Sequence, residues 1–93
     1  MTKAEKARMQ AIAELGCIVC MREGNPETPA EIHHIRSDVG IGQRSTHVLP
    51  LCSWHHRLGG YSQAIHAGRR VWEDRFGTEL ELVEAVEKLL DSN

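Results

Sequence analysis

Two pairs of residues in this 93-residue chain have the spacing of a metal site. Two residues separate Cys17 from Cys20, and two separate Cys52 from His55. Zinc binds thiolate and imidazole in a tetrahedron, and a two-residue spacer lets both members of a pair reach one ion from a single turn. These four side chains therefore predict a structural Zn²⁺ site. His56 follows His55 directly, so spacing alone does not decide which of the two imidazoles completes the site.

Other interpretations of the three cysteines are less favoured. They could be small core residues, but a random chain of this length seldom contains two pairs with zinc spacing. Cys17 and Cys20 could form a redox pair, but no βαβ pattern surrounds them. An odd number of cysteines also argues against a disulfide framework.

A second group of imidazoles could form another centre. On a strand His33 and His34 point to opposite faces, so two roles are expected for this pair. On a helix His56 is turned about 100° from His55, so it can serve a different site. Besides His55, the candidates are His33, His34, His47, His56 and His66.

Size and composition suggest that a metal contributes to stability. A chain of 93 residues forms one domain at most, and such a domain buries only about 60 to 65% of its unfolded surface. One Phe, one Tyr and two Trp are few for a core. A structural metal would compensate for that small core.

The charge distribution indicates where a polyanion would bind. The net charge of −2 speaks against a general nucleic-acid binder. Residues 32–75, however, carry 6 basic groups, all of them Arg, against 3 acidic groups. Planar guanidinium groups match phosphate geometry. The candidates for contacts with DNA phosphates are Arg57, Arg69 and Arg70.

Helices are predicted at both ends of the chain. Thr2 and Glu5 form a capping box that opens a helix over 3–15. Thr78 and Glu81 form another, which opens a final helix with its carboxylates toward solvent. The inward stripe of that helix consists of Leu82, Val86, Leu89 and Leu90.

Short elements are predicted between these helices. The segments "EIHHI" (31–35) and "HVLPL" (47–51) are candidate strands. Pro50 requires an edge or the end of a strand. The other expected elements are a loop over 21–30, a connection over 36–46, a short helix over about 53–58 and a helical stretch over 62–76.

The segments "CIVC", "EIHHI" and "HVLPLCSWHH" resemble the HNH nucleases. The longer segment "GIGQRSTHVLPLCSWHHRLGGYSQAIHAGRRVWEDRFGTE" is similar to the phage recombination-enhancement family of RecA-dependent nucleases. This resemblance covers about residues 17–80 and implies an α+β fold with a zinc-stapled ββα-metal core. It implies one HNH-type domain over 1–93, with an N-terminal helix (1–16), the core (17–58) and C-terminal helices (62–91).

The resemblance also implies roles for individual histidines. The general base of HNH enzymes matches His34, and the metal ligand before it matches His33. The metal-binding histidine on the helix matches His56. Phosphodiester hydrolysis needs a base to deprotonate water and a cation to offset charge on the phosphate, and imidazole can accept a proton at neutral pH.

Two positions depart from the HNH pattern. The Asn that usually steadies the base corresponds to His47 here, so the resemblance makes His47 a candidate catalytic residue. A further helical ligand position holds Gly60, and His66 is the candidate to supply the missing imidazole. A site of mostly imidazoles favours transition metals, although Mg²⁺ could act with substrate oxygens in its shell. The expected catalytic ion is therefore Mg²⁺, Mn²⁺ or Zn²⁺.

The resulting hypothesis is a metal-dependent DNA endonuclease that acts with a RecA-type recombinase filament. The alternative is a non-catalytic zinc-stapled module that binds nucleic acid or protein. A metalloprotease is disfavoured because the chain lacks H-E-x-x-H. The chain shows neither a signal peptide nor 18 consecutive apolar residues, so we expect a cytoplasmic protein without membrane contact.

Overall fold

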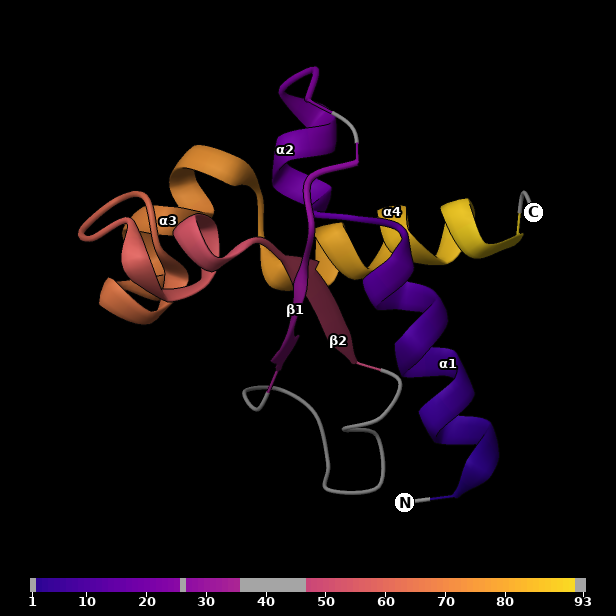
Figure 1. Cartoon of the computed structure of the whole chain (residues 1–93). Coiled ribbons are helices and arrows are strands. Elements are labelled where there is room, and N and C mark those ends of the chain that lie inside the picture. The colour runs from indigo at the N-terminus through magenta and orange to yellow at the C-terminus, as the bar shows by residue number, and fades with distance from the viewer. Residues whose placement is uncertain (1, 26, 36–46, 92–93) are drawn as a thin grey trace.

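The computed structural model describes residues 2–25, 27–35 and 47–91 as helices around a two-stranded sheet (Figure 1). The expected connection over 36–46 lies outside these residues. Among the described helices, none has the length and hydrophobicity of a membrane span. The elements are α1 (Lys3–Glu14), α2 (Ile18–Arg22), β1 (Glu31–His34), β2 (Val48–Leu51), the π-helix η2 (Trp54–Leu58), the 3₁₀ helix η3 (Ile65–Ala67), α3 (Arg69–Phe76) and α4 (Glu79–Asp91).

The two predicted strands are confirmed and pair antiparallel. Ile32 lies opposite Pro50, and His33 lies opposite Leu49. Pro50 has no N–H to donate, which is tolerated because each strand of a two-stranded sheet has an edge. All four residues of β2 are buried, whereas β1 is buried fully only at His33. β2 is therefore the strand that lies within the core.

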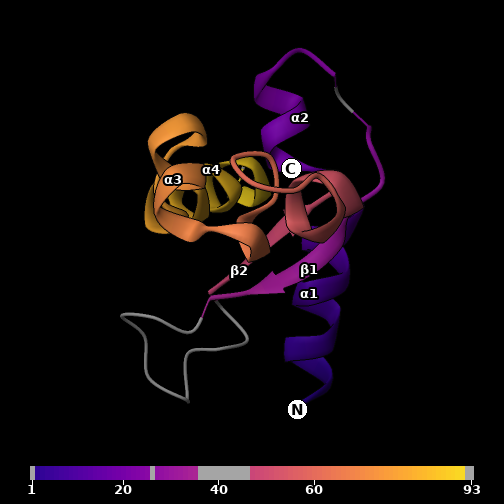
Figure 2. The same cartoon turned by 90° about the vertical axis from the view of Figure 1, so that its left-hand side faces the viewer.

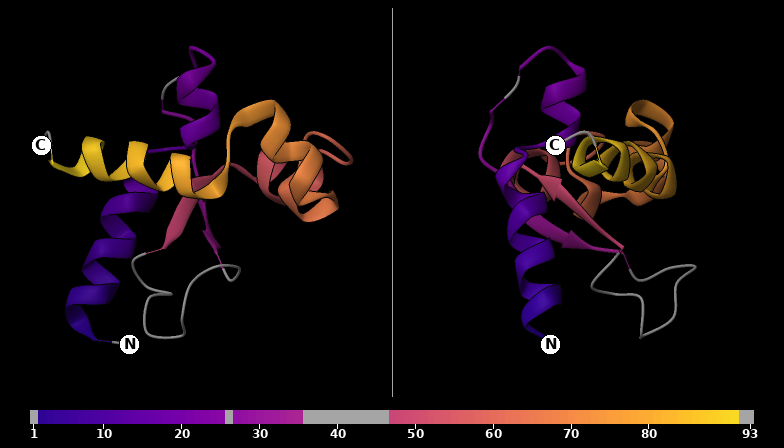
Figure 3. Two further views of the ribbon diagram at one scale, coloured as in Figure 1. Left: turned by 180° about the vertical axis from the view of Figure 1, so that it is seen from behind. Right: turned by 90° about the vertical axis from the view of Figure 1, so that its right-hand side faces the viewer.

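Helices pack on β2 from several directions. α1, α2 and α4 all contact it, and η2 follows directly from its end. Figures 1 and 2 both show α2 above the strands and α1 running downward beside them. Figure 3 shows α4 lying across the sheet from behind. The largest fully buried side chains include Trp72, Ile12, Ile18, Leu49, Leu51 and Leu82.

Both predicted capping boxes are present. At α1, Thr2 and Glu5 exchange backbone and side-chain hydrogen bonds. At α4, the Thr78 N–H donates to Glu81 Oε1 at 3.2 Å, and the Glu81 N–H donates to Thr78 Oγ1 at 3.1 Å. Hydrogen bonds from the side chain and from the backbone N–H of Thr78 to the Glu81 carboxylate lower the pKa of Glu81. The two helices begin where short-range capping predicts.

The predicted loop over 21–30 and helix over 62–76 were partly wrong. Residues 21 and 22 complete α2, which Cys17 caps by accepting the Cys20 N–H at its sulfur, 3.4 Å away. The second stretch is divided into η3 and α3 at Gly68. The φ of Gly68 is 159°, far from a helical value, so one helix cannot continue through it.

A further correction concerns α4, whose carboxylates were expected to face solvent. Glu79, its first residue, is only 4% exposed. It occupies the face of α4 that also carries Leu82, Val83 and Val86, which are buried. An acidic side chain therefore enters the interior from this helix.

We expect Leu82→Ala to destabilise the protein by about 2 to 5 kcal/mol, because it leaves a cavity in a packed core. Leu82 is 0% exposed. Leu80→Ala is the matched control, since Leu80 lies on the same helix but is 45% exposed, and should change stability by about 0.5 kcal/mol or less. Urea unfolding measures both, and equal losses would contradict the assigned packing of α4.

Candidate metal centres

Four side chains that could bind a metal converge beside β2 from distant parts of the chain. Cys17 and Cys20 lie at the start of α2, Cys52 directly follows β2, and His55 lies in η2. All four are buried, and their donor atoms lie within 4.8 Å of one another. Cys52 Sγ is 3.2 Å from His55 Nδ1, and Cys20 Sγ is 3.7 Å from Cys52 Sγ. We call these four residues the cysteine cluster.

The separations in the cysteine cluster fit a tetrahedral ion. With Zn–S near 2.3 Å and Zn–N near 2.0 Å, tetrahedral angles place two sulfurs about 3.8 Å apart and sulfur about 3.5 Å from nitrogen. His55 Nδ1 lies 3.5 Å from Cys20 Sγ and 3.7 Å from Cys17 Sγ. Three thiols and one imidazole could therefore hold one metal ion.

The protonation of these groups also suits a metal. Burial raises the pKa of Cys17, and burial together with the neighbouring Cys17 thiol raises that of Cys20 to about 12. The thiolates therefore need a cation nearby to become stable. Burial lowers the pKa of His55, which favours the neutral imidazole that binds metals.

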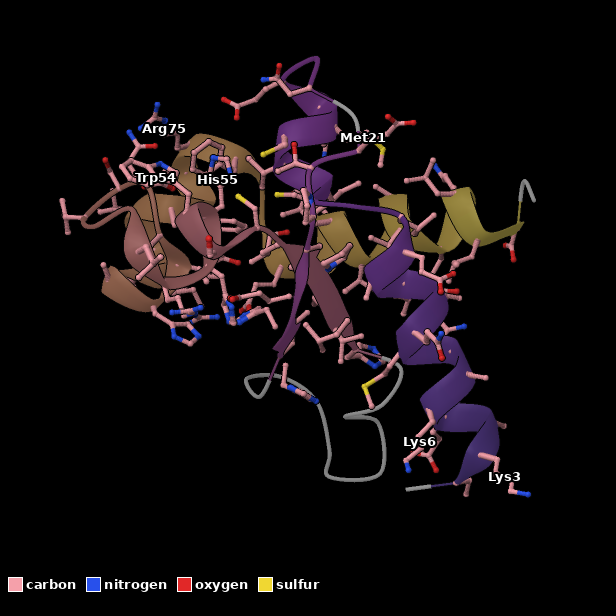
Figure 4. The ribbon with its side chains drawn as sticks, viewed as in Figure 1. Lys3, Lys6, Met21, Trp54, His55 and Arg75 are labelled. Atoms are coloured by element: carbon pink, nitrogen blue, oxygen red, sulfur yellow. The ribbon has the colours of Figure 1, made fainter. Side chains whose placement is uncertain are left out.

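A carboxylate on the side of the His55 ring away from the sulfurs favours its orientation. Its Nδ1 faces the sulfurs, whereas its Nε2 lies 3.5 Å from Glu23 Oε1. A carboxylate at one imidazole nitrogen favours the proton there and leaves the other nitrogen for the metal. In Figure 4 His55 lies beside the lower part of α2, on the same side of that helix as Arg75. Sequence reasoning missed Glu23, because nothing in its spacing marks it.

Three further imidazoles converge from β1, η2 and η3. His33, His56 and His66 offer nitrogens that lie within 4.8 Å of one another. The ring centroids of His56 and His66 are 4.3 Å apart, and His33 is 5.2 Å from His56. We call these three residues the histidine cluster, and it could hold a second ion. The adjacent His55 and His56 thus belong to different clusters, as the sequence suggested.

The histidine cluster lines an open groove of about 510 Å³. His34 lines the same groove, although it is exposed where His33 is buried. The two side chains alternate as expected for a strand, but both reach the groove at the end of β1. The other lining residues are Ile32, Arg69 and Glu79. His47 precedes β2 and is not among the described residues that line the groove.

Two carboxylates that sequence reasoning missed contact the histidine cluster. Glu79 Oε2 lies 2.7 Å from His33 Nε2, and Glu31 Oε1 lies 2.8 Å from His56 Nδ1. One signal pointed to Glu79, because it lies three residues before Leu82 on the inward face of α4. No comparable signal pointed to Glu31.

The surroundings keep both carboxylates ionised. Hydrogen bonds from Arg57 and then from His56 lower the pKa of Glu31 to about 2. Burial alone would raise the pKa of Glu79, but the hydrogen bond from His33 and the charges of His33 and Arg69 outweigh it, so this pKa is lowered. Burial, followed by the neighbouring imidazoles, lowers the pKa of His66.

The predicted DNA-contacting arginines differ in their placement. Arg57 Nη2 donates to Glu31 Oε2 at 2.6 Å, and Arg69 Nη1 lies 3.5 Å from Glu79 Oε1. Both arginines therefore pair with the carboxylates that contact the histidine cluster. Arg70 is exposed on α3 and is not among the described residues that line the groove.

Comparison with known proteins gives a family. A family model described as "Recombination enhancement, RecA-dependent nuclease" matches residues 1–91. No curated protein matches the chain. The matched range includes both clusters and both carboxylates that contact the histidine cluster.

A cobalt titration should separate the two adjacent imidazoles. Co²⁺ is a spectroscopic probe for thiolate ligands, so wild type and His56→Ala should both show the absorption of a sulfur-rich site. His55→Ala should bind the ion weaker by at least about 10- to 100-fold, since it removes a ligand rather than an outer partner. Equal thiolate–cobalt absorption and affinity in both variants would contradict the assignment of His55 to the cysteine cluster.

Proposed function

Because the chain belongs to the family of RecA-dependent nucleases of recombination enhancement, we propose that it is a metal-dependent DNA endonuclease of the HNH type. The family name implies both RecA and DNA as partners. One observation carries the HNH assignment: three imidazoles from separate elements converge in an open groove that His34 also lines. A cation and a base could act there on the same phosphate.

The cysteine cluster would hold a structural zinc. Its buried thiols and imidazole support this role, since closed four-ligand sites of this composition are structural. The ion would join the start of α2 to the end of β2 and to η2, and the ligands from α2 precede the other two by 32 to 38 residues in the chain. The order β1, β2, η2 is consistent with a ββα core over 17–58 within a single nuclease domain over 1–93.

The histidine cluster would hold the catalytic cation. Its three imidazoles fit transition metals such as Mn²⁺ or Zn²⁺, and Mg²⁺ would need oxygens from water and substrate. When bound, the cation would offset the negative charge that develops on the scissile phosphate. His33 and His56 are mostly buried and held by neighbours, so they would present the ion in one position.

His34 would act as the general base. It lies at the last position of β1, is exposed to the groove, and is therefore accessible to a water molecule beside the phosphate. The imidazole would take a proton from that water as its oxygen attacks phosphorus and the 3′ oxygen leaves. An imidazole suits this step because it can accept a proton at neutral pH.

The arginines would contact phosphates rather than bases. Arg57 and Arg69 lie next to the histidine cluster, and Arg70 follows on the exposed side of α3. Lys3 and Lys6 lie at the far end of α1, away from His55 (Figure 4). With a net charge of −2, the chain would bind DNA weakly by itself. A RecA filament would then supply the targeting.

The test is strand cleavage by wild type and His34→Ala. Each protein is incubated with single-stranded, duplex and RecA-paired DNA, with Mg²⁺ or Mn²⁺ or with chelator. We expect metal-dependent cleavage that falls by about 10²- to 10⁴-fold in His34→Ala, because general-base catalysis contributes that much. Circular dichroism checks that the variant remains folded.

Other results of this assay would point elsewhere. Full activity in His34→Ala would remove the general-base assignment. Absence of cleavage by a folded, metal-loaded wild type on all three substrates would favour the non-catalytic binding module.

We also propose that His47 replaces the Asn that steadies the base in HNH enzymes. The sheet register places His34 opposite Val48, the residue after His47. His47→Asn should retain cleavage, since an amide can also hydrogen-bond, whereas His47→Ala should lose roughly tenfold for one lost hydrogen bond. Single-turnover rates measure this difference, and a rate equal to that of wild type in both variants would place His47 outside catalysis.

A further inference from the structure

Two of the three imidazoles of the histidine cluster take part in similar three-residue series of contacts. Arg57 contacts Glu31, which contacts His56 at 2.8 Å. Arg69 contacts Glu79, which contacts His33 at 2.7 Å. In each series of contacts a carboxylate lies between an arginine and a member of the histidine cluster.

These contacts determine which nitrogen of each imidazole carries a hydrogen. An ionised carboxylate can only accept, so His33 donates through Nε2 and His56 donates through Nδ1. The nitrogen left with a lone pair is Nδ1 in His33 and Nε2 in His56. The two imidazoles would therefore present different nitrogens to a common ion.

Glu79 is held firmly for this role. Its side chain is 5% exposed, and Arg69 Nη1 lies 3.5 Å from its second oxygen. Its backbone N–H donates to Glu73 Oε2 at 2.8 Å, which ties the start of α4 to α3. Burial of a carboxylate costs solvation free energy unless hydrogen bonds and opposite charges offset the loss. For Glu79 these partners are His33 and Arg69, which both line the groove.

We propose that Glu79 is a positioning residue that orients His33 and determines the nitrogen facing the groove ion, and that Glu31 does the same for His56. This inference rests on the proposed function, because it assumes that the histidine cluster holds a metal. Among the described residues, the donor atoms that lie within 4.8 Å of one another at this site come from the three imidazoles. Neither Glu79 nor Glu31 belongs to that group. Glu79 therefore acts through His33 and does not bind the ion itself.

The two carboxylates should differ in importance. Glu31 pairs with Arg57, whose side chain is 50% exposed, so water can take the place of a lost carboxylate. Water has much less access to the buried Glu79. We expect the larger effect from Glu79.

The experiment measures Mn²⁺ affinity in the zinc-loaded protein without DNA, from the EPR signal of the free ion. Glu79→Ala should weaken binding on the order of 10- to 100-fold, as loss of such outer partners does elsewhere. Glu79→Gln should retain part of the affinity, because the amide oxygen still accepts from His33. Glu84→Ala is the matched control, since Glu84 is exposed on the same helix and should leave affinity unchanged. Thermal melting checks that each variant is folded.

A second readout follows the imidazoles directly. With excess Zn²⁺ in both clusters, long-range ¹H–¹⁵N spectra should show the proton of His33 on Nε2 and that of His56 on Nδ1. A proton on Nδ1 of His33 would overturn the proposal, since Nε2 would then face the ion.

The Mn²⁺ outcomes separate this inference from the proposed function. If wild type binds no Mn²⁺, or if His33→Ala leaves its Mn²⁺ binding unchanged, the proposed metal site in the groove is wrong. This inference is then wrong as well. If wild type binds Mn²⁺ and Glu79→Ala binds equally well, only the positioning role fails. Weaker binding in Glu79→Ala with an unchanged Glu84→Ala supports the role.

Discussion

Burial of β2 is the constraint on which the rest of the structure depends. All four of its residues are buried, and α1, α2 and α4 pack against it. Pairing with β1 places His33 opposite Leu49 and brings the end of β1 to the groove. Cys52 and η2 follow directly from its end. A strand of four residues thus positions donors for both clusters.

The two clusters share η2 and differ in their surroundings. His55 enters a buried group of thiols, whereas His56 joins an open groove. Such a division suits one closed site that stabilises and one accessible site that reacts. An ion in the cysteine cluster would hold η2 in place and would thereby fix the position of His56.

The charge around the histidine cluster is less positive than that of residues 32–75, which supply its imidazoles. Residues 32–75 carry three more basic than acidic groups, but Glu31 and Glu79 lie just outside that range. The fold returns both carboxylates to the histidine cluster, where they pair with Arg57 and Arg69. The surroundings of the histidine cluster are therefore less positive than a count along the chain indicates, which is consistent with the proposed need for a RecA filament in DNA targeting.

The sequence by itself determined the features that depend on neighbouring residues. The capping boxes at Thr2 and Thr78 and the strands were predictable, because capping and side-chain alternation act over a few residues. The two-residue spacing within each pair, Cys17 with Cys20 and Cys52 with His55, indicated metal ligands for the same reason, because both members of a pair lie within one turn. The break at Gly68 was missed, since the helical pattern of apolar residues continues across it.

Only the tertiary structure decided which of His55 and His56 joins the cysteines and which carboxylates contact the histidine cluster. His33 and Glu79 are 46 residues apart, and their contact depends on how α4 packs on β2. The pattern of α4 marked Glu79 as an inward position, but an acidic residue there is normally expected to face solvent. Its burial is stable because His33 and Arg69, from two other parts of the fold, meet it there. Such compensation arises in three dimensions, so neither spacing nor periodicity reveals it.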